Sequence, residues 1–194
     1  MPVLAFGANI WQPAMCREAT LAALAAGFRN IWSSELVGAS CQRAQAEAIR
    51  SSGVPREELF LAGTVNTQRC SSENDCYRQT LHQSEAQFEF LGEKELDMLM
   101  LDYPPRSPGC DGIQGQWRAF EELYAAKRVR TIAVSNFDSA QLRCIVDRDS
   151  ATVPAVNQML YAVGSGGNPV VEENSRYGIN VQAYTPLSSG GLAR

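Results

Sequence analysis

The sequence of 194 residues has no long apolar run and no excess of positive charge. Its longest apolar runs, such as residues 99–101 and 153–156, are far shorter than the roughly 20 residues that a membrane-spanning helix needs. Seventeen basic against 21 acidic side chains leave a net charge of −4, so the basic surface typical of nucleic-acid-binding proteins is missing. We therefore expect a chain that neither spans a membrane nor binds nucleic acid.

Residues that bind metals are also scarce. His82 is the only histidine, and we expect it on a helix surface, because no second histidine could share a metal with it. The cysteines form no Cys-x-x-Cys pair; they are Cys16, Cys41, Cys70, Cys76, Cys110 and Cys144. We predict no metal site and reduced, structural thiols. A local disulfide or soft-metal site at Cys70 and Cys76 is the alternative, although their spacing matches no standard zinc pattern.

The first residues lack the basic start and the apolar region of a secretory signal. This favours a cytoplasmic protein, or an organellar one if the chain is a processed form. An apolar content of 45% over this length supports one sizeable core, so we expect a single domain over residues 1–194.

Strand-like and helix-like segments alternate along the chain. Short apolar segments predict six strands, at residues 29–32, 59–65, 96–103, 130–135, 154–159 and 179–185. Helical spacing of apolar residues separates them, which predicts parallel strands joined by right-handed crossovers and an α/β fold. An eight-unit barrel uses roughly 31 residues per unit, so this length allows about six units. An open sheet and part of a barrel fit equally well.

Three short motifs carry a family resemblance. Residues 127–137, KRVRTIAVSNF, resemble the signature GKVRxIGVSNF of the aldo-keto reductase family; residues 156–158 match its VNQ strand, and residues 183–187, AYTPL, resemble its AYSPL strand. With residues 17–38, 54–65 and 96–104 the resemblance covers almost the whole chain in order. It implies an incomplete (β/α)8 TIM barrel of about six units, truncated after the sixth strand, and a nicotinamide cofactor.

The same overlay changes every residue of the family's catalytic tetrad. The positions of its Asp, Tyr, Lys and His are occupied here by Trp32, Val37, Thr64 and Asp102. Carbonyl reduction leaves an oxyanion that needs a proton, and a general acid typically contributes about 10²–10⁴-fold. Neither valine nor threonine supplies that proton, so the overlay predicts no catalytic residues at these positions. Trp32 is expected to fill the former catalytic cavity.

The positions that hold nicotinamide in the family are better matched. They are Ser135, Asn136, Gln158 and Tyr184, where the resemblance implies hydrogen bonds to the carboxamide and a ring that stacks on the nicotinamide. The alternative is that these side chains only satisfy buried strand ends. The family's units that bind the adenosine 2′-phosphate would follow residue 187, so we expect weak NADP(H) binding, with a dissociation constant no tighter than roughly 100 μM.

Two further features are weaker. Glu35 and Asp102 could face one another across the former active site, whereas a migrated tyrosine such as Tyr103 would be poorly activated without the family's lysine. Residues 164–167, GSGG, could cradle a phosphate but lack the lysine and spacing of a P-loop, which favours a flexible connection.

These observations predict a catalytically inactive aldo-keto reductase-like protein that acts as a binding or scaffold subunit. A protein partner or further copies would cover open sheet edges at residues 29–32 and 179–185. The alternative is an NADP-dependent carbonyl reductase of which this chain is a fragment. A third possibility is a redox-responsive thiol protein that uses Cys70 or Cys76.

Overall fold

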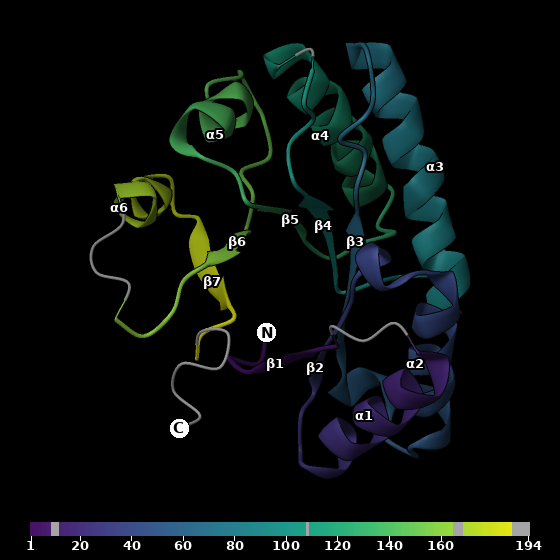
Figure 1. The fold of residues 1–194 in the computed structure, drawn as a ribbon. Helices are drawn as coiled ribbons and strands as arrows, with labels where there is room; N and C mark the ends of the chain where they lie inside the picture. Colours follow the sequence, from purple (N-terminus) through teal and green to yellow (C-terminus); the bar gives the residue numbers. More distant parts are fainter. Residues whose placement is uncertain (9–11, 108, 165–168, 188–194) are drawn as a thin grey trace.

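The computed structural model describes residues 1–8, 12–107, 109–164 and 169–187, and it is built on one sheet of seven parallel strands. The strands lie side by side in sequence order. They are β1 (Ala5–Gly7), β2 (Asn30–Ser33), β3 (Phe60–Val65), β4 (Met98–Asp102), β5 (Ile132–Ser135), β6 (Val156–Leu160) and β7 (Asn180–Tyr184). The sheet curls so that β1 and β7 come near one another (Figure 1). This curled sheet confirms the expected α/β fold of the TIM-barrel type.

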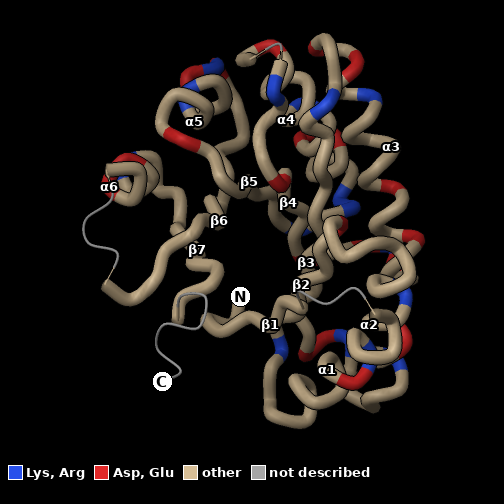
Figure 2. Tube along the Cα trace, viewed as in Figure 1, with Lys and Arg blue, Asp and Glu red and all other residues tan. Residues whose placement is uncertain are grey.

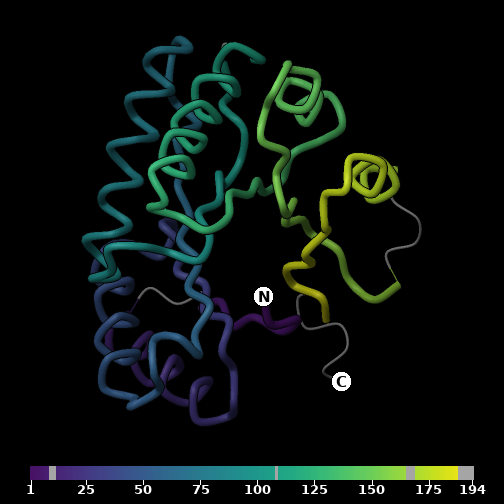
Figure 3. The backbone as a smooth tube through the Cα atoms, turned by 180° about the vertical axis from the view of Figure 1, so that it is seen from behind, coloured from purple at the N-terminus to yellow at the C-terminus, as the bar shows by residue number. Residues whose placement is uncertain are grey.

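Helices connect successive strands and cover the outer side of the curl (Figures 1 and 3). They are α1 (Pro13–Ala25), α2 (Ala39–Ser51), α3 (Glu73–Leu91), α4 (Cys110–Ala125), α5 (Ser139–Val146) and α6 (Pro169–Arg176), with single 3-10 turns at η1 (Glu35–Val37) and η2 (Arg56–Glu58). Local signals set their ends. The Ser72 side chain accepts a hydrogen bond from the Asp75 N–H at the start of α3, and Gly92 ends that helix in the left-handed conformation.

The expected number of strands was one too low. The missed strand, β1, has only three residues, Ala5–Gly7, and so short a segment shows no periodicity that a sequence can reveal. It pairs with residues 30–32 of β2. The segment that we expected to be an open edge is therefore an interior strand, and β1 takes its place at the edge.

Two apolar layers line the two faces of the sheet. The larger layer lies between the sheet and the helices and includes Leu99, Leu101 and Trp117. The smaller layer lies inside the curl and includes Trp32, Met98 and Met100. Successive residues of β4 thus point to opposite faces, as strand geometry requires.

The edge strands differ from the central ones in burial. Every residue of β2, β4 and β5 is buried, whereas β7 is half-buried or exposed along its length. Among the described residues, β1 pairs with β2 alone and β7 with β6 alone. That a partner or a second copy covers these edges stays a prediction.

All six cysteines are paired, contrary to the expected reduced thiols. The disulfides join Cys16 to Cys41, Cys70 to Cys76 and Cys110 to Cys144. The local Cys70–Cys76 pair was the alternative considered from the sequence. The other two pairs are 25 and 34 residues apart, and only the packing of α1 on α2 and of α4 on α5 brings them together.

In the described part of the chain, no helix is both long enough and apolar enough to cross a membrane. Of residues 164–167, proposed from the sequence as a phosphate cradle or a flexible connection, all but the first lie outside the described residues.

Candidate active site

The candidate site lies at the carboxyl ends of the strands, on the inner face of the curl. A cavity of about 690 Å³ opens there between the two edge strands, and its lining includes Trp32, Ser34, Thr64, Asp102, Gln158 and Tyr184. Strand parity explains the position of Asp102, because it follows Met98 and Met100 on the inward row of β4. Carboxyl ends of barrel strands are where such folds place their active sites.

Charge is sparse around this cavity. Lys, Arg, Asp and Glu lie mainly on the helices, and β1, β6 and β7 carry none (Figure 2). Within the described chain, Asp102 is the single acidic side chain that lines the cavity. An anion at this position therefore has little opposite charge to stabilise it.

Three of the four predicted cofactor residues form a hydrogen-bonded set. The Tyr184 hydroxyl donates to Asn136 Oδ1 at 2.9 Å, and Asn136 Nδ2 donates to Ser135 Oγ at 2.9 Å. The fourth residue, Gln158, joins them through its backbone, because its carbonyl accepts from the Asn136 N–H at 2.8 Å. Its side chain instead donates to Gln182 Oε1 at 2.8 Å. The structure thus brings the four residues together.

The backbone is strained at this end of the sheet. Tyr103, Asn136 and Thr185 directly follow β4, β5 and β7, and their φ angles are 75°, 62° and 53°. Asparagine tolerates the left-handed region, but a bulky or β-branched residue there is an outlier. Strain of this kind clusters at functional sites, where the surrounding structure holds it in place. No sequence signal reveals these conformations.

Burial raises the pKa of both carboxyl groups near the cavity. Burial is the main cause for Asp102, and a hydrogen bond from Ser135 opposes it by favouring the carboxylate. Burial also raises the pKa of Glu35, and the negative charge of Asp102 raises it further. These effects support the predicted proximity of the two residues. Both carboxyl groups therefore keep their protons to higher pH than usual.

The pKa of Tyr184, which lies near these carboxyl groups, is raised above its usual value. Burial is the largest cause of the raised pKa of Tyr184, followed by the charge of Tyr103 and a hydrogen bond with it. A phenol with an ordinary pKa of 10.0 is already a weak donor near neutral pH. Tyr184 is weaker still, so the carboxyl groups are the better proton donors here.

Three of the four tetrad positions, Trp32, Thr64 and Asp102, line the cavity, and Val37 does not. Trp32 is buried in the inner apolar layer, and its Nε1 has no hydrogen-bond partner among the described residues. Thr64 accepts a hydrogen bond from the Glu35 N–H at 2.9 Å. Val37 packs against Cys16 and Cys41. The residues that sequence reasoning missed are Ser34 and Gln182, since their facing direction depends on the register of the strands.

A second hollow, of about 740 Å³, lies between the ends of α3 and α4 and contains none of the predicted cofactor residues. His82 lines it and is exposed on α3, where the sequence placed it. No group of three or more His, Cys, Asp or Glu residues in the described ranges could hold a metal ion.

Comparison with known proteins gives consistent matches. The model of the Aldo/keto reductase family matches residues 7–194. Similar proteins include an aldo-keto reductase of Mycobacterium sp. (strain JLS), 33% identical over 96% of this chain, and the glyoxal reductase of Bacillus subtilis (strain 168), 30% identical over 96%. The chain spans 64% of the length of each of these two relatives.

Solved structures agree with these matches. The aldo/keto reductase from Brucella melitensis superposes with a TM-score of 0.84 at 28% identity, covering 96% of this chain and 69% of that one. An aldo-keto reductase enzyme from a deep-sea metagenome gives a TM-score of 0.85 at 26% identity, covering 100% and 66%.

These relatives correct one expectation from the sequence. We expected an inactive scaffold subunit of a larger assembly, because the tetrad is replaced. That interpretation is wrong, because the similar proteins are named as reductases and nothing in them points to a scaffold role. Loss of one set of catalytic side chains is therefore a weak argument against an oxidoreductase when other acidic groups lie beside the same cavity.

Proposed function

Because this chain belongs to the aldo/keto reductase family, we propose that its curled sheet forms the nicotinamide side of a site for NADP(H)-dependent reduction of carbonyl compounds. The observation that carries the proposal is the hydrogen-bonded set of Ser135, Asn136 and Tyr184 beside the cavity. The names of the relatives, such as glyoxal reductase, support the same reaction class. The chain covers 64% of those relatives, so the activity of the whole protein is part of the proposal.

The side chains at the strand ends fit a nicotinamide in their chemistry. Asn136 and Gln158 each offer a carboxamide, which both donates and accepts, and Ser135 offers a hydroxyl. Such groups complement the carboxamide of nicotinamide, and Tyr184 offers an aromatic ring. When bound, the cofactor supplies a hydride. We expect weak binding by these residues, because Tyr184 already occupies the acceptor of Asn136 and must give way.

Asp102 is our candidate for the proton donor. Reduction of a carbonyl places an electron pair on the substrate oxygen, which must receive a proton. Asp102 lines the cavity and is buried, and burial raises its pKa. A carboxyl group that stays protonated closer to neutral pH can give that proton to the oxygen and regain one from solvent.

The test is NADPH oxidation by the purified chain with glyoxal or an aromatic aldehyde. Asp102→Asn should lower kcat by about 10²–10⁴-fold and leave NADPH binding unchanged in calorimetry. Asn136→Ala should weaken NADPH binding about tenfold, equivalent to about 1.4 kcal/mol. Tyr184→Phe keeps the ring and frees the acceptor of Asn136, so it should tighten NADPH binding. Tyr177→Phe is the matched control and should leave binding unchanged, because Tyr177 packs against the outer apolar layer.

Each result decides one part of the proposal. A wild-type chain that neither binds nor oxidises NADPH contradicts the function. Normal turnover in Asp102→Asn contradicts only the assignment of the proton donor. Equal effects of Tyr184→Phe and Tyr177→Phe on NADPH binding contradict the assignment of the nicotinamide site.

A further inference from the structure

Each of the three disulfides lies next to a loop that leaves the carboxyl end of a strand. Cys41, Cys76 and Cys110 are within the first four residues of α2, α3 and α4, and these helices begin where the loops after β2, β3 and β4 end. The paired Cα atoms are 5.6, 4.9 and 5.2 Å apart. Two of these disulfides therefore lie at the ends of the loops that contain Glu35 and Tyr103, and the loop with Tyr103 directly follows Asp102, the last residue of β4.

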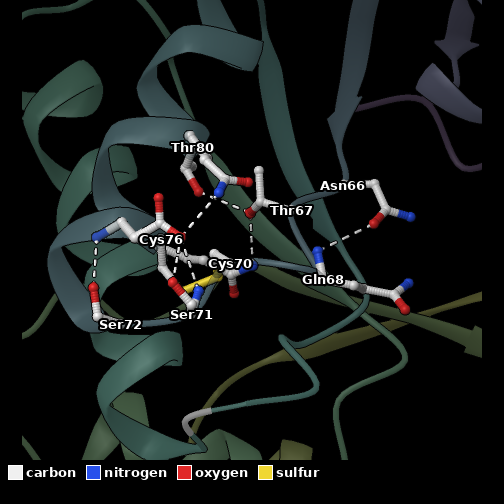
Figure 4. Close-up of a disulfide and its surroundings, with 11 residues drawn as sticks. Asn66, Thr67, Gln68, Cys70, Ser71, Ser72, Cys76 and Thr80 are labelled. Atoms are coloured by element: carbon white, nitrogen blue, oxygen red, sulfur yellow. Dashed lines mark hydrogen bonds between the residues drawn. A yellow bond between two sulfur atoms is a disulfide. The ribbon is translucent and has the colours of Figure 1, made fainter.

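Two of the disulfides are buried. Cys16 and Cys41 are fully buried and pack on Val37, two residues after Glu35. Cys70 and Cys76 are 2% and 0% exposed, and Figure 4 shows them within a polar network. In that network Thr67 shares a 2.9 Å hydrogen bond with Thr80 of α3.

The loop around Cys70 is also fixed to its neighbours. Gln116 of α4 donates to Thr67 Oγ1 at 2.8 Å, and the backbone of Cys70 donates to the Thr67 carbonyl at 3.3 Å. A Cβ atom at Gly115 would overlap the Glu73 carbonyl, so α3 and α4 touch closely here. A reductant reaches this disulfide only when the surrounding structure opens.

The third disulfide is accessible. Cys110 is exposed and Cys144 is half-buried. Cys110 is the first residue of α4, and the N-cap residue, Gly109, has no side chain that could cap the helix. The first turn of an uncapped helix frays easily; the bond to α5 tethers its first residue, and the buried Ile113 packs the end of the turn into the core. Exposed disulfides are the ones most readily reduced.

The Cys110–Cys144 disulfide lies at one end of the segment that follows Asp102, and β4 lies at the other end. Between these ends the Arg106 N–H donates to the Gln68 carbonyl at 3.0 Å. Within the segment Tyr103 has a φ of 75° and its N–H donates to the Ser135 carbonyl at 3.2 Å. A strained residue keeps its conformation only while the surrounding segment is held.

We propose that the exposed Cys110–Cys144 disulfide is a redox-sensitive positioning element for the segment carrying Asp102 and Tyr103, while the two buried disulfides hold the neighbouring loops in both redox states. This rests on the proposed function for its effect on turnover. A dithiol reductant breaks the S–S bond; two electrons and two protons convert Cys110 and Cys144 to thiols, and the reductant becomes a disulfide. The first turn of α4 then frays, and Tyr103 relaxes away from its strained backbone.

The first test follows the order of reduction. The purified chain is titrated with dithiothreitol, its free thiols are alkylated, and the labelled peptides are identified by mass spectrometry. Cys110 and Cys144 should be labelled first, and the four buried cysteines only at higher reductant concentration or after unfolding. Simultaneous labelling of all six, or earlier labelling of Cys70 and Cys76, overturns the proposal.

The second test is hydrogen exchange with the Cys110→Ser/Cys144→Ser variant. The amides of Tyr103, Arg106 and Ser107 and of the first turn of α4 should exchange at least about tenfold faster than in the oxidised wild type, and those of β4 should not change. The matched control is wild type with only this disulfide reduced, which should behave like the variant. Unchanged exchange at Tyr103, Arg106 and Ser107 in both samples overturns the proposal.

Turnover is the separate readout. Opening this disulfide should lower kcat by about tenfold or more and change NADPH binding less than twofold, because Ser135 and Asn136 belong to β5 and the turn after it. A fall in NADPH binding with unchanged kcat contradicts positioning of Asp102. Absence of NADPH oxidation in the oxidised wild type counts against the proposed function alone, since the exchange and labelling results do not depend on turnover.

Discussion

The two ends of β4 hold aspartates in opposite surroundings. Asp97, just before the strand, accepts hydrogen bonds from Arg56 at 2.8 Å, from Arg130 at 3.0 Å and from the Leu61 N–H at 2.9 Å. At the other end Asp102 is also buried, but its pKa is raised and no cation is among the causes. Arginines and a backbone amide thus stabilise the Asp97 carboxylate at the amino end of the sheet. At the carboxyl end, burial disfavours the ionised form of Asp102.

This difference separates structural from functional residues on one strand. A buried carboxylate that is fully paired needs no further explanation than folding. A buried carboxyl group without a cation costs stability, and such a cost is common where a group is needed for chemistry. The contrast supports placing the reaction beside Asp102 and not beside Asp97.

The largest expected change in stability follows substitution of Asp97, at the amino end of β4. Asp97→Asn removes the charge that two arginines and one backbone amide share, and we expect a loss of about 3 kcal/mol in the free energy of unfolding. Urea denaturation monitored by circular dichroism measures it. Glu89→Gln is the control, because the Glu89–Arg43 pair is exposed and should contribute less than about 0.5 kcal/mol. Equal effects of the two substitutions would contradict a special role for the amino end.

At the carboxyl end of β4 we expect substitution of the aspartate to increase stability. Because the folded state raises the pKa of Asp102 above its ordinary 3.8, the folded chain binds the proton more tightly than the unfolded chain. Stability therefore falls as pH rises from about 4 through the raised pKa, and the whole penalty is present above it. Asp102→Asn removes this penalty, so it should stabilise the chain at pH 7.

The pH dependence of that gain is the decisive measurement. Below pH 3.8 Asp102 is protonated in both states, so wild type and Asp102→Asn should unfold at the same urea concentration. A gain that is the same at pH 3 and pH 7 would assign the effect to packing. A loss of stability at pH 7 would contradict a net destabilisation by the buried Asp102 carboxylate.

The sequence predicted the central strands better than the edge strands and the disulfides. Apolar runs such as residues 96–103 and the motif at residues 134–137 have strong local signals, so β4, β5, Ser135 and Asn136 were placed correctly. Strand β1 is too short to show a period. The pairing of Cys110 with Cys144 depends on how α4 packs on α5, and the left-handed Tyr103 depends on tertiary contacts, so local sequence carries no information on either.

The smallest expected changes in stability are at two residues with left-handed backbone conformation, Lys127 and Asn136. Lys127 is exposed, follows α4 and has a φ of 59°; its N–H bonds to the Tyr124 carbonyl at 3.0 Å, which needs no side chain. The left-handed conformation costs about 1–2 kcal/mol for an ordinary residue, and the entropy of a glycine offsets about 0.5–1 kcal/mol of the relief. Lys127→Gly should therefore stabilise the chain by about 0.5 kcal/mol. Asn136→Gly relieves the same kind of strain but loses the hydrogen bonds with Ser135 and Tyr184, so it should destabilise the chain. Thermal unfolding of both variants measures these opposite changes, which distinguish a residue that only ends a helix from a residue of the site.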